Sequence, residues 1–169
     1  MPAARSILPL SAATLLAACA ATGDSAPPPC PRVAFLYGLH AVDELDVDGR
    51  ALPVRAELSA IRGSCTYGGD AIELDYRFDI LVEPTAEVAG GRVRVPWLLV
   101  VLDERGAVVA RERFSTELEV GRPGERSGAS EHLRQTLPTD RARGPAWRVL
   151  IALDLPEDEA LANWEASRF

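Results

Sequence analysis

Cysteine and histidine are the side chains of this chain best suited to nucleophilic or metal chemistry, and it has three cysteines and two histidines. His40 and His132 lie far apart in the sequence, and no serine stands in the Gly-x-Ser-x-Gly pattern of a nucleophile elbow. A catalytic histidine needs a positioned partner, and structural zinc sites use closely spaced ligands. The sequence offers neither, so we expect no catalytic and no metal site, unless the fold alone assembles a triad.

The acidic segment from Glu44 to Gly49 comes nearest to a metal-binding motif. Glu44, Asp46 and Asp48 alternate as the first oxygen ligands of an EF-hand calcium loop do. Position twelve of that loop should be glutamate and is Arg55 here, and no helix pattern flanks the segment. We therefore expect a solvated turn, with a weak calcium site as the alternative.

The chain has no lysine, and all 18 of its basic residues are arginine. A phosphate-binding P-loop, a Ser-x-x-Lys acyl enzyme and a Schiff-base enzyme each need a lysine, so these classes are excluded. The formal net charge of −7 disfavours nucleic acid and anionic lipid surfaces as ligands. Nothing in the composition indicates a cofactor.

The N-terminus has the layout of an export signal. Arg5 supplies a basic start, residues 7–16 an apolar stretch, and Ala17-Ala18 the small residues that a signal peptidase requires. The stretch is shorter than the roughly 20 apolar residues that cross a bilayer. Leu16-Ala17-Ala18-Cys19 resembles the lipobox of bacterial lipoproteins, which implies that Cys19 is acylated and begins the mature protein. An ordinary secretory peptide cut elsewhere would leave Cys19 incidental.

Ala20 and the residues after it bear on where the protein resides. In lipoproteins an aspartate after the cysteine retains the protein in the inner membrane, so the resemblance implies anchoring in the outer membrane, facing the periplasm. Residues 20–29 end in Pro27-Pro28-Pro29 and indicate a tether of about 30 Å. The predicted organisation is a signal peptide (1–18), a lipidated cysteine with its tether (19–29) and one domain (30–169).

Cys30 and Cys65 remain as an even pair once Cys19 is lipidated. Paired cysteines in an oxidising compartment usually form a structural disulfide. A two-thiol metal site or a nucleophilic cysteine is the alternative, but no Cys-x-x-Cys or His-x-His motif supports either one. We therefore expect a disulfide between Cys30 and Cys65.

Alternation of apolar and polar residues predicts most of the secondary structure. The longest alternating run covers residues 72–82, which is typical of a half-buried antiparallel strand. Residues 33–39 form a short apolar segment, and further strands are expected over residues 54–60, 93–102, 107–114, 116–120, 131–137 and 146–153. Loops are expected over residues 41–50, with a turn at Asp48-Gly49, over residues 103–106, and over residues 122–128.

The chain is expected to end in a helix that starts near Pro156 and carries Leu161 and Trp164 as an apolar stripe. About seven short strands, no internal repeat and one terminal helix favour an all-β fold, a single immunoglobulin-like or fibronectin-like antiparallel sandwich with a short C-terminal helix. A small closed barrel is the alternative.

Several short segments of the mature region also suggest a family. They are Cys30-Pro31-Arg32-Val33, Cys65 with Tyr67, Val95-Pro96-Trp97 with its following hairpin, and the tail Leu153-x-Leu155 with Glu159-x-Leu161-x-Asn163. In these segments the mature region resembles a group of small uncharacterised proteobacterial envelope lipoproteins. The resemblance implies the fold and the envelope location, and it carries over no functional residue.

The strand at residues 97–102 is apolar on both faces, whereas a sandwich strand usually has one wet face. Either residues 33–39 or the C-terminal helix cover the second face, or Leu98, Val100 and Leu102 form a patch for a partner. We therefore expect a lipid-anchored binding or structural module that acts through contacts with an envelope protein and is not an enzyme. The alternative is a periplasmic enzyme or small-ligand carrier, marked by a deep pocket where His40 or His132 meets carboxylates.

Cys19→Ala is expected to abolish acylation, because the lipid is attached to the thiol of this residue. The variant should be left uncleaved or be released from membranes. Detergent partitioning and the electrophoretic mobility of the processed chain measure this. A variant that partitions and matures like the wild type would contradict the lipoprotein assignment.

Overall fold

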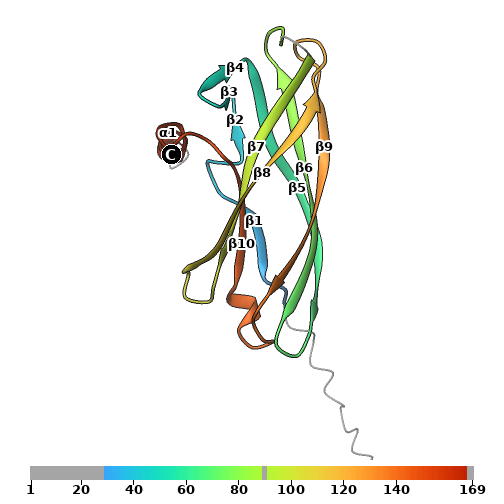
Figure 1. Cartoon of the computed structure of the whole chain (residues 1–169), viewed down its shortest axis with the longest axis vertical. Coiled ribbons are helices and arrows are strands. Elements are labelled where there is room, and N and C mark those ends of the chain that lie inside the picture. Colours follow the sequence, from blue (N-terminus) through green and yellow to red (C-terminus); the bar gives the residue numbers. More distant parts are fainter. Residues whose placement is uncertain (1–28, 89–90, 167–169) are drawn as a thin grey trace, which may run out of the picture.

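The computed structural model describes residues 29–88 and 91–166 and shows two β-sheets packed face to face (Figure 1). Cys19, the signal peptide and the tether up to residue 28 lie outside the described residues. A two-stranded hairpin and one C-terminal helix complete the described part of the chain. The described strands form two separate sheets, so the predicted sandwich is confirmed over its alternative.

Four short strands near the N-terminus are followed by five long strands in the middle of the described chain. In chain order they are β1 (Arg32–Phe35), β2 (Ala41–Val42), β3 (Leu45–Val47), β4 (Arg50–Leu52), β5 (Val54–Tyr67), β6 (Ile72–Pro84), β7 (Arg92–Leu102), β8 (Val108–Glu119), β9 (Ser127–Leu137), a short 3-10 helix (Gly144–Ala146), β10 (Arg148–Leu153) and α1 (Glu157–Ala166).

Sheet A has the strand order β1-β10-β7-β8 and sheet B the order β2-β5-β6-β9. Between these two sheets the chain crosses after β1, β6, β8 and β9, so the pairs β6–β9 and β7–β10 join strands that are not consecutive, as in a Greek key. One pair departs from the predicted antiparallel order, because β1 runs parallel to β10 with Arg32 opposite Arg148. These strands come from opposite ends of the domain, and no turn forces them to be antiparallel.

The core lies between the two sheets and follows the predicted alternation. Every second residue of β6 from Ile72 to Val82 is buried. Trp97 of β7 lies at the centre, where its ring meets Phe78 edge-on at 5.1 Å and stacks on Phe114 at 4.3 Å. Burying one large apolar side chain stabilises a fold by about 1.5–3 kcal/mol, so these aromatic contacts hold sheet B against sheet A.

A hydrogen-bond chain also joins the sheets. The Trp97 indole N–H donates to Thr116 Oγ1 at 3.0 Å, and the Thr116 hydroxyl donates to a Glu131 carboxylate oxygen at 2.6 Å. Trp97 and Thr116 belong to sheet A, whereas Glu131 belongs to β9 of sheet B. A buried indole N–H requires a partner, and here the partner links the two layers.

The prediction of a loop over residues 41–50 is wrong, since this segment forms β2 and β3 and begins β4. Val42 and Leu45 are buried, and their burial holds the segment on the sandwich despite its acidic composition. The predicted turn at Asp48-Gly49 is confirmed. Both residues have positive φ, 57° and 77°, as a two-residue type I′ hairpin requires.

Two further boundaries differ from the prediction. Residues 107–114 and 116–120 belong almost entirely to one strand, β8, and β9 begins at Ser127, inside the expected loop. Gly128 in β9 lies so close to β6 that a Cβ there would be 2.5 Å from the Ile80 carbonyl oxygen. A glycine that permits close strand approach has the same sequence signal as a loop, which explains the error.

The predicted disulfide is confirmed. Cys30 and Cys65 are bonded with their Cα atoms 5.7 Å apart, within the usual range of disulfides. The bond ties the start of β1 to β5, and the Tyr67 hydroxyl donates to the Pro29 carbonyl oxygen at 2.6 Å in the same region. The N-terminal end of the described chain is therefore fastened to the sandwich.

Replacing Cys30 and Cys65 together by serine is expected to lower the free energy of unfolding by about 3.5–4 kcal/mol. The cross-link spans 35 residues, and its loss returns loop entropy to the unfolded chain. Urea unfolding of the full chain carrying Cys19→Ala, with and without the two serines, measures the difference. Equal unfolding midpoints would show that the bond contributes nothing to stability.

Candidate functional site

The outer face of sheet B is charged, and ion pairs within the face neutralise many of its charges. Arg62 reaches Asp79 at 3.2 Å, and Arg126 reaches Glu83 at 3.1 Å. The same pattern continues in the pairs Arg55–Asp43 and Arg126–Glu57. Such a surface is typical of the solvated side of a sandwich.

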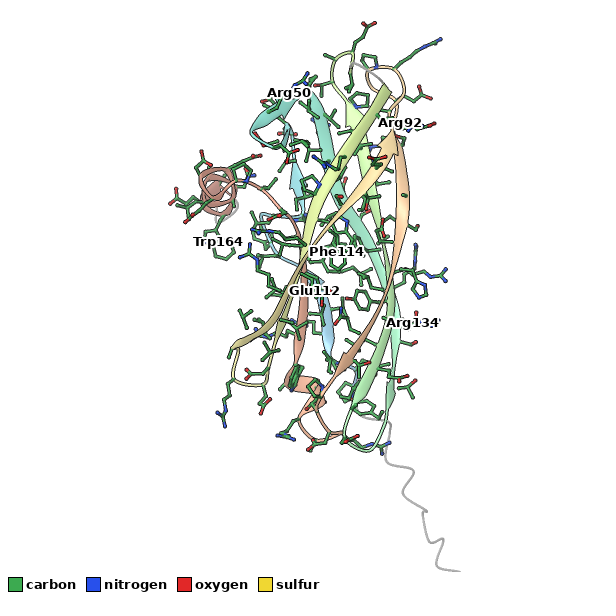
Figure 2. All side chains as sticks on the ribbon, viewed as in Figure 1. Arg50, Arg92, Glu112, Phe114, Arg134 and Trp164 are labelled. Atoms are coloured by element: carbon green, nitrogen blue, oxygen red, sulfur yellow. A yellow bond between two sulfur atoms is a disulfide. The ribbon has the colours of Figure 1, made fainter. Side chains whose placement is uncertain are left out.

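His132 lies on this outer face, in β9. Its Nε2 is 2.8 Å from the Asp75 carboxylate, and the Arg134 guanidinium donates to the other carboxylate oxygen at 3.1 Å. The hydrogen bond from His132 and those from Arg134 lower the pKa of Asp75, against a smaller effect of burial. Arg134 projects from the outer side of sheet B (Figure 2). The cluster is an exposed ion-pair network.

The outer face of sheet A is different, because its outward residues on three neighbouring strands are mostly apolar. The strand register places Leu98 of β7 beside Ala152 of β10, and Val100 beside Leu150. Leu102 follows on the same side of β7, and all of these except buried Ala152 are half-buried. We call the outward residues Ala34, Leu36, Leu98, Val100, Leu102, Val108, Leu150 and Ala152 the apolar face.

A groove of about 770 Å³ lies over part of the apolar face. Leu98 and Val100 line it, together with Leu36 and Leu39 from the segment after β1. On one side it is bounded by the start of α1, with Pro156 and Ala160, and on the other by Arg111 and Arg113 of β8. Figure 1 shows α1 end-on, set apart from the strands and joined to β10 by a connecting segment.

Both predicted covers of the doubly apolar strand are thus present, and each covers it only in part. Leu36 and Leu39 both come from residues 33–39, and α1 adds its first turn. The expected apolar stripe of the helix is not buried, because Leu161 is 59% and Trp164 42% exposed. Two of the three predicted patch residues, Leu98 and Val100, therefore line an open groove.

The arginines at the groove were not among the sequence candidates. Arg111 and Arg113 alternate along β8 and face the same side as Val100 and Leu98, their register partners in β7. Arg113 pairs with Asp154 at 2.9 Å. Their spacing of two was the available signal, but charged residues at every second position are also normal on a solvated strand.

The two histidines are not brought together. His40 borders a hollow near α1, and the described residues lining it with His40 are Tyr37, Gly38, Ala41, Asn163 and Ala166. Its ring stacks against Phe35 and Tyr37 at 6.4 Å between centroids. None of those lining residues is a carboxylate. His40 precedes β2, whereas His132 lies in β9 at the other edge of sheet B.

The acidic segment is used for structure. Asp46 accepts a hydrogen bond from the Gly49 amide at 2.8 Å, and Asp48 pairs with Arg94. Burial raises the pKa of Glu159 in α1, and nearby acidic groups including Asp46 raise it further. Among residues 29–88 and 91–166, no three histidine, cysteine or acidic side chains are placed to hold a metal ion.

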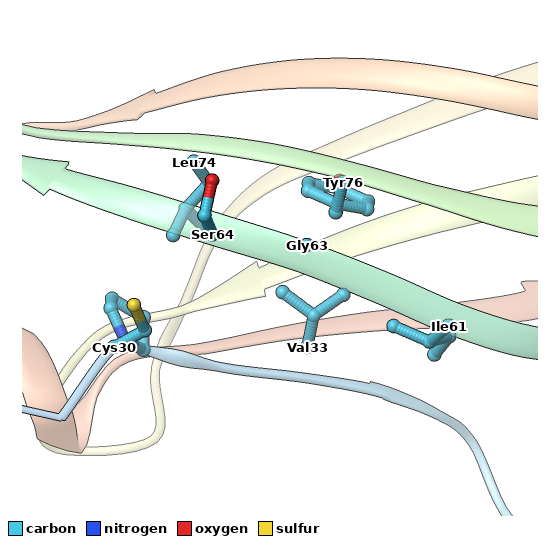
Figure 3. Close-up of a pocket in the computed structure, with 8 residues that line it drawn as sticks. Cys30, Val33, Ile61, Gly63, Ser64, Leu74 and Tyr76 are labelled. Atoms are coloured by element: carbon cyan, nitrogen blue, oxygen red, sulfur yellow. The ribbon is translucent and has the colours of Figure 1, made fainter.

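A smaller cavity of about 170 Å³ opens between β1 and β5 beside the disulfide (Figure 3). Val33, Ile61, Leu74 and Tyr76 line it. Gly63 forms part of its wall, and a Cβ there would lie 2.6 Å from that of Tyr76. The cavity is apolar and much smaller than the groove on sheet A.

Comparisons with known proteins add little. No family model matches the chain, and no curated protein matches it. The crystal structure of a DUF1425 family member from Shewanella sp. pv-4 is similar at a TM-score of 0.37 and 14% sequence identity, over 68% of this chain and 90% of that one. At that TM-score and identity the match assigns neither a fold nor a function.

No helix in the described part of the chain is long and apolar enough to span a membrane.

Asp75→Asn is expected to lower the free energy of unfolding at pH 7 but not at about pH 2. The folded state lowers the pKa of Asp75, so its carboxylate stabilises the fold above about pH 4, and this contribution is lost as the pH falls through the folded pKa. Urea unfolding of the variant and the wild type at both pH values measures it. A difference of equal size at both would show that the ion pairs are not its cause.

Proposed function

We propose that this chain is a lipid-anchored protein of the cell envelope whose sandwich acts as a binding module through contacts with a protein partner. The observation that carries the proposal is the apolar face of sheet A, which is left partly open beside α1. The proposal also includes anchoring at Cys19 in the outer membrane, facing the periplasm.

The contrast between the two outer faces supports this role. Sheet B covers its outer side with ion pairs such as Arg62–Asp79 and Arg126–Glu83. Sheet A keeps leucine and valine at outward positions of three adjacent strands. Contiguous exposed apolar surface on a domain generally marks an interaction site, and fold stability does not require it because the core lies on the inner face.

The geometry of the groove supports the same role. Its volume of about 770 Å³ is large enough to receive several side chains of another chain. The described chain begins at one end of the sandwich, and sheet A, which carries the apolar face, runs along one side of it (Figure 1). A domain tethered at that end would present this side to proteins at the membrane surface.

Val100→Asp in the full, anchored chain is expected to abolish partner capture while the domain stays folded. Val100 is half-buried and lies beside Arg111, so the new carboxylate has a cation to pair with and should cost about 1–2 kcal/mol. Cross-linking in intact envelopes followed by affinity purification measures capture, and thermal unfolding measures stability.

Leu81→Asp is the matched control, since Leu81 is half-buried on the outer face of sheet B. It likewise replaces a half-buried apolar side chain by aspartate, but on the sheet face that the proposal does not involve. The proposal predicts that proteins retained by Leu81→Asp are lost with Val100→Asp. If both folded variants capture the same proteins as the wild type, the apolar face is not the binding surface.

A further inference from the structure

Three arginines around the apolar face form no ion pair within the described residues. Arg111 lines the groove, and Arg32 and Arg148 stand at the opposite end of the face from Asp154. Arg113 differs, because Asp154 neutralises it at 2.9 Å. The face is therefore an apolar floor with uncompensated positive charge along one side and one end.

The arrangement of Arg32 and Arg148 is unfavourable by itself. The parallel register of β1 and β10 sets them opposite one another, and both are exposed while the next residues, Val33 and Val149, point inward. Like charges directly opposite on neighbouring strands repel. A bound anionic group would relieve this repulsion.

Carboxylates near this end of the face are engaged elsewhere. Asp103 accepts hydrogen bonds from the backbone amides of Arg105 and Ala107, at 2.9 and 2.8 Å, and so closes its own hairpin. Glu104 lies 3.9 Å from Arg143. Neither carboxylate forms an ion pair with Arg32 or Arg148, so both guanidinium groups are available to an anionic ligand.

We propose that the apolar face binds an extended, acidic segment of a protein partner. The apolar side chains of this segment pack on Leu98 and Val100, and its carboxylates lie near Arg111 and Arg148. This inference rests on the proposed function and specifies the chemistry of its partner. Charge complementarity selects an acidic segment over a basic one. It also disfavours a second copy of this chain, because a twofold pairing of the face would bring the arginine rims together.

A concave groove suits a chain segment better than a flat bilayer. Glu157 borders the groove at the α1 side, and Asp154 lines it nearby. The net charge of −7 would add repulsion from an anionic membrane. A polypeptide can place its carboxylates near the arginines and away from Asp154 and Glu157. An anionic lipid surface would present negative charge to these two acidic residues as well.

The test uses the full chain carrying Cys19→Ala, labelled with nitrogen-15, and short end-capped peptides that alternate valine with glutamate, lysine or serine. The glutamate peptide is expected to shift the amide signals of β7 and β10 and to bind at least about tenfold more tightly than the lysine peptide, which corresponds to about two surface ion pairs. Raising the salt concentration should reduce the difference.

The decisive variants are Arg148→Glu and Arg111→Glu, with Arg77→Glu as the matched control. Arg77 is exposed on the outer face of sheet B and has no ion pair among the described residues. The proposal predicts that the first two variants lose the preference for the glutamate peptide and that Arg77→Glu keeps it. Equal affinities of all three peptides, or an equal effect of all three variants, would overturn it.

The outcomes also separate this inference from the proposed function. If the three peptides shift the same β7 and β10 amides equally, the face binds polypeptide without charge selection, and only the acidic specificity fails. If no peptide shifts these amides, both fail. If vesicles of phosphatidylglycerol, but not of phosphatidylcholine, bind the chain through Arg148 while the glutamate peptide does not, the ligand is a lipid and the polypeptide proposal is wrong.

Discussion

Residues 97–102 of strand β7 are apolar on both faces, and the rest of the structure is arranged around that constraint. Its inward residues Trp97, Leu99 and Val101 are buried against sheet B. Trp97 contacts both Phe78 and Phe114 and begins the hydrogen-bond chain that reaches Glu131. The strand lies between β10 and β8, so its outward residues require cover that those two neighbours cannot give.

The outer face of sheet A is covered only in part, and this distinguishes it from the outer face of sheet B. The segment after β1 and the first turn of α1 reach the edge of the outward surface at Leu36 and Ala160. Between them the apolar residues remain half-buried, next to arginines. Sheet B needs no cover, because its outward side chains satisfy one another as ion pairs in water, each pair being worth little by itself.

The N-terminal end of the domain shows how a short strand is kept in place. Strand β1 pairs only four residues with β10, which is little for an edge strand. The Cys30–Cys65 disulfide and the hydrogen bond from Tyr67 to Pro29 fix its start to β5 in the other sheet. With its start held, β1 can take the edge beside β10 and place Arg32 next to Arg148.

The sequence by itself determined the features that depend on neighbouring residues. Alternation assigned β6 and β10 and their inward faces, and a continuous apolar run indicated β7. The Asp48-Gly49 and 103–106 turns followed from turn chemistry, and cysteine parity indicated the disulfide. Leu98 and Val100 were found because a doubly apolar strand is visible without a fold. The prediction of a loop over residues 41–50 was wrong because the burial of Val42 and Leu45 depends on contacts that composition does not show. Only the tertiary structure decided that β1 lies parallel to β10, that α1 leaves a groove, and that Arg32, Arg111 and Arg148 border one face. A strand's inward side is set by a period of two along the chain, whereas its neighbours are set by long-range packing, which leaves no local pattern.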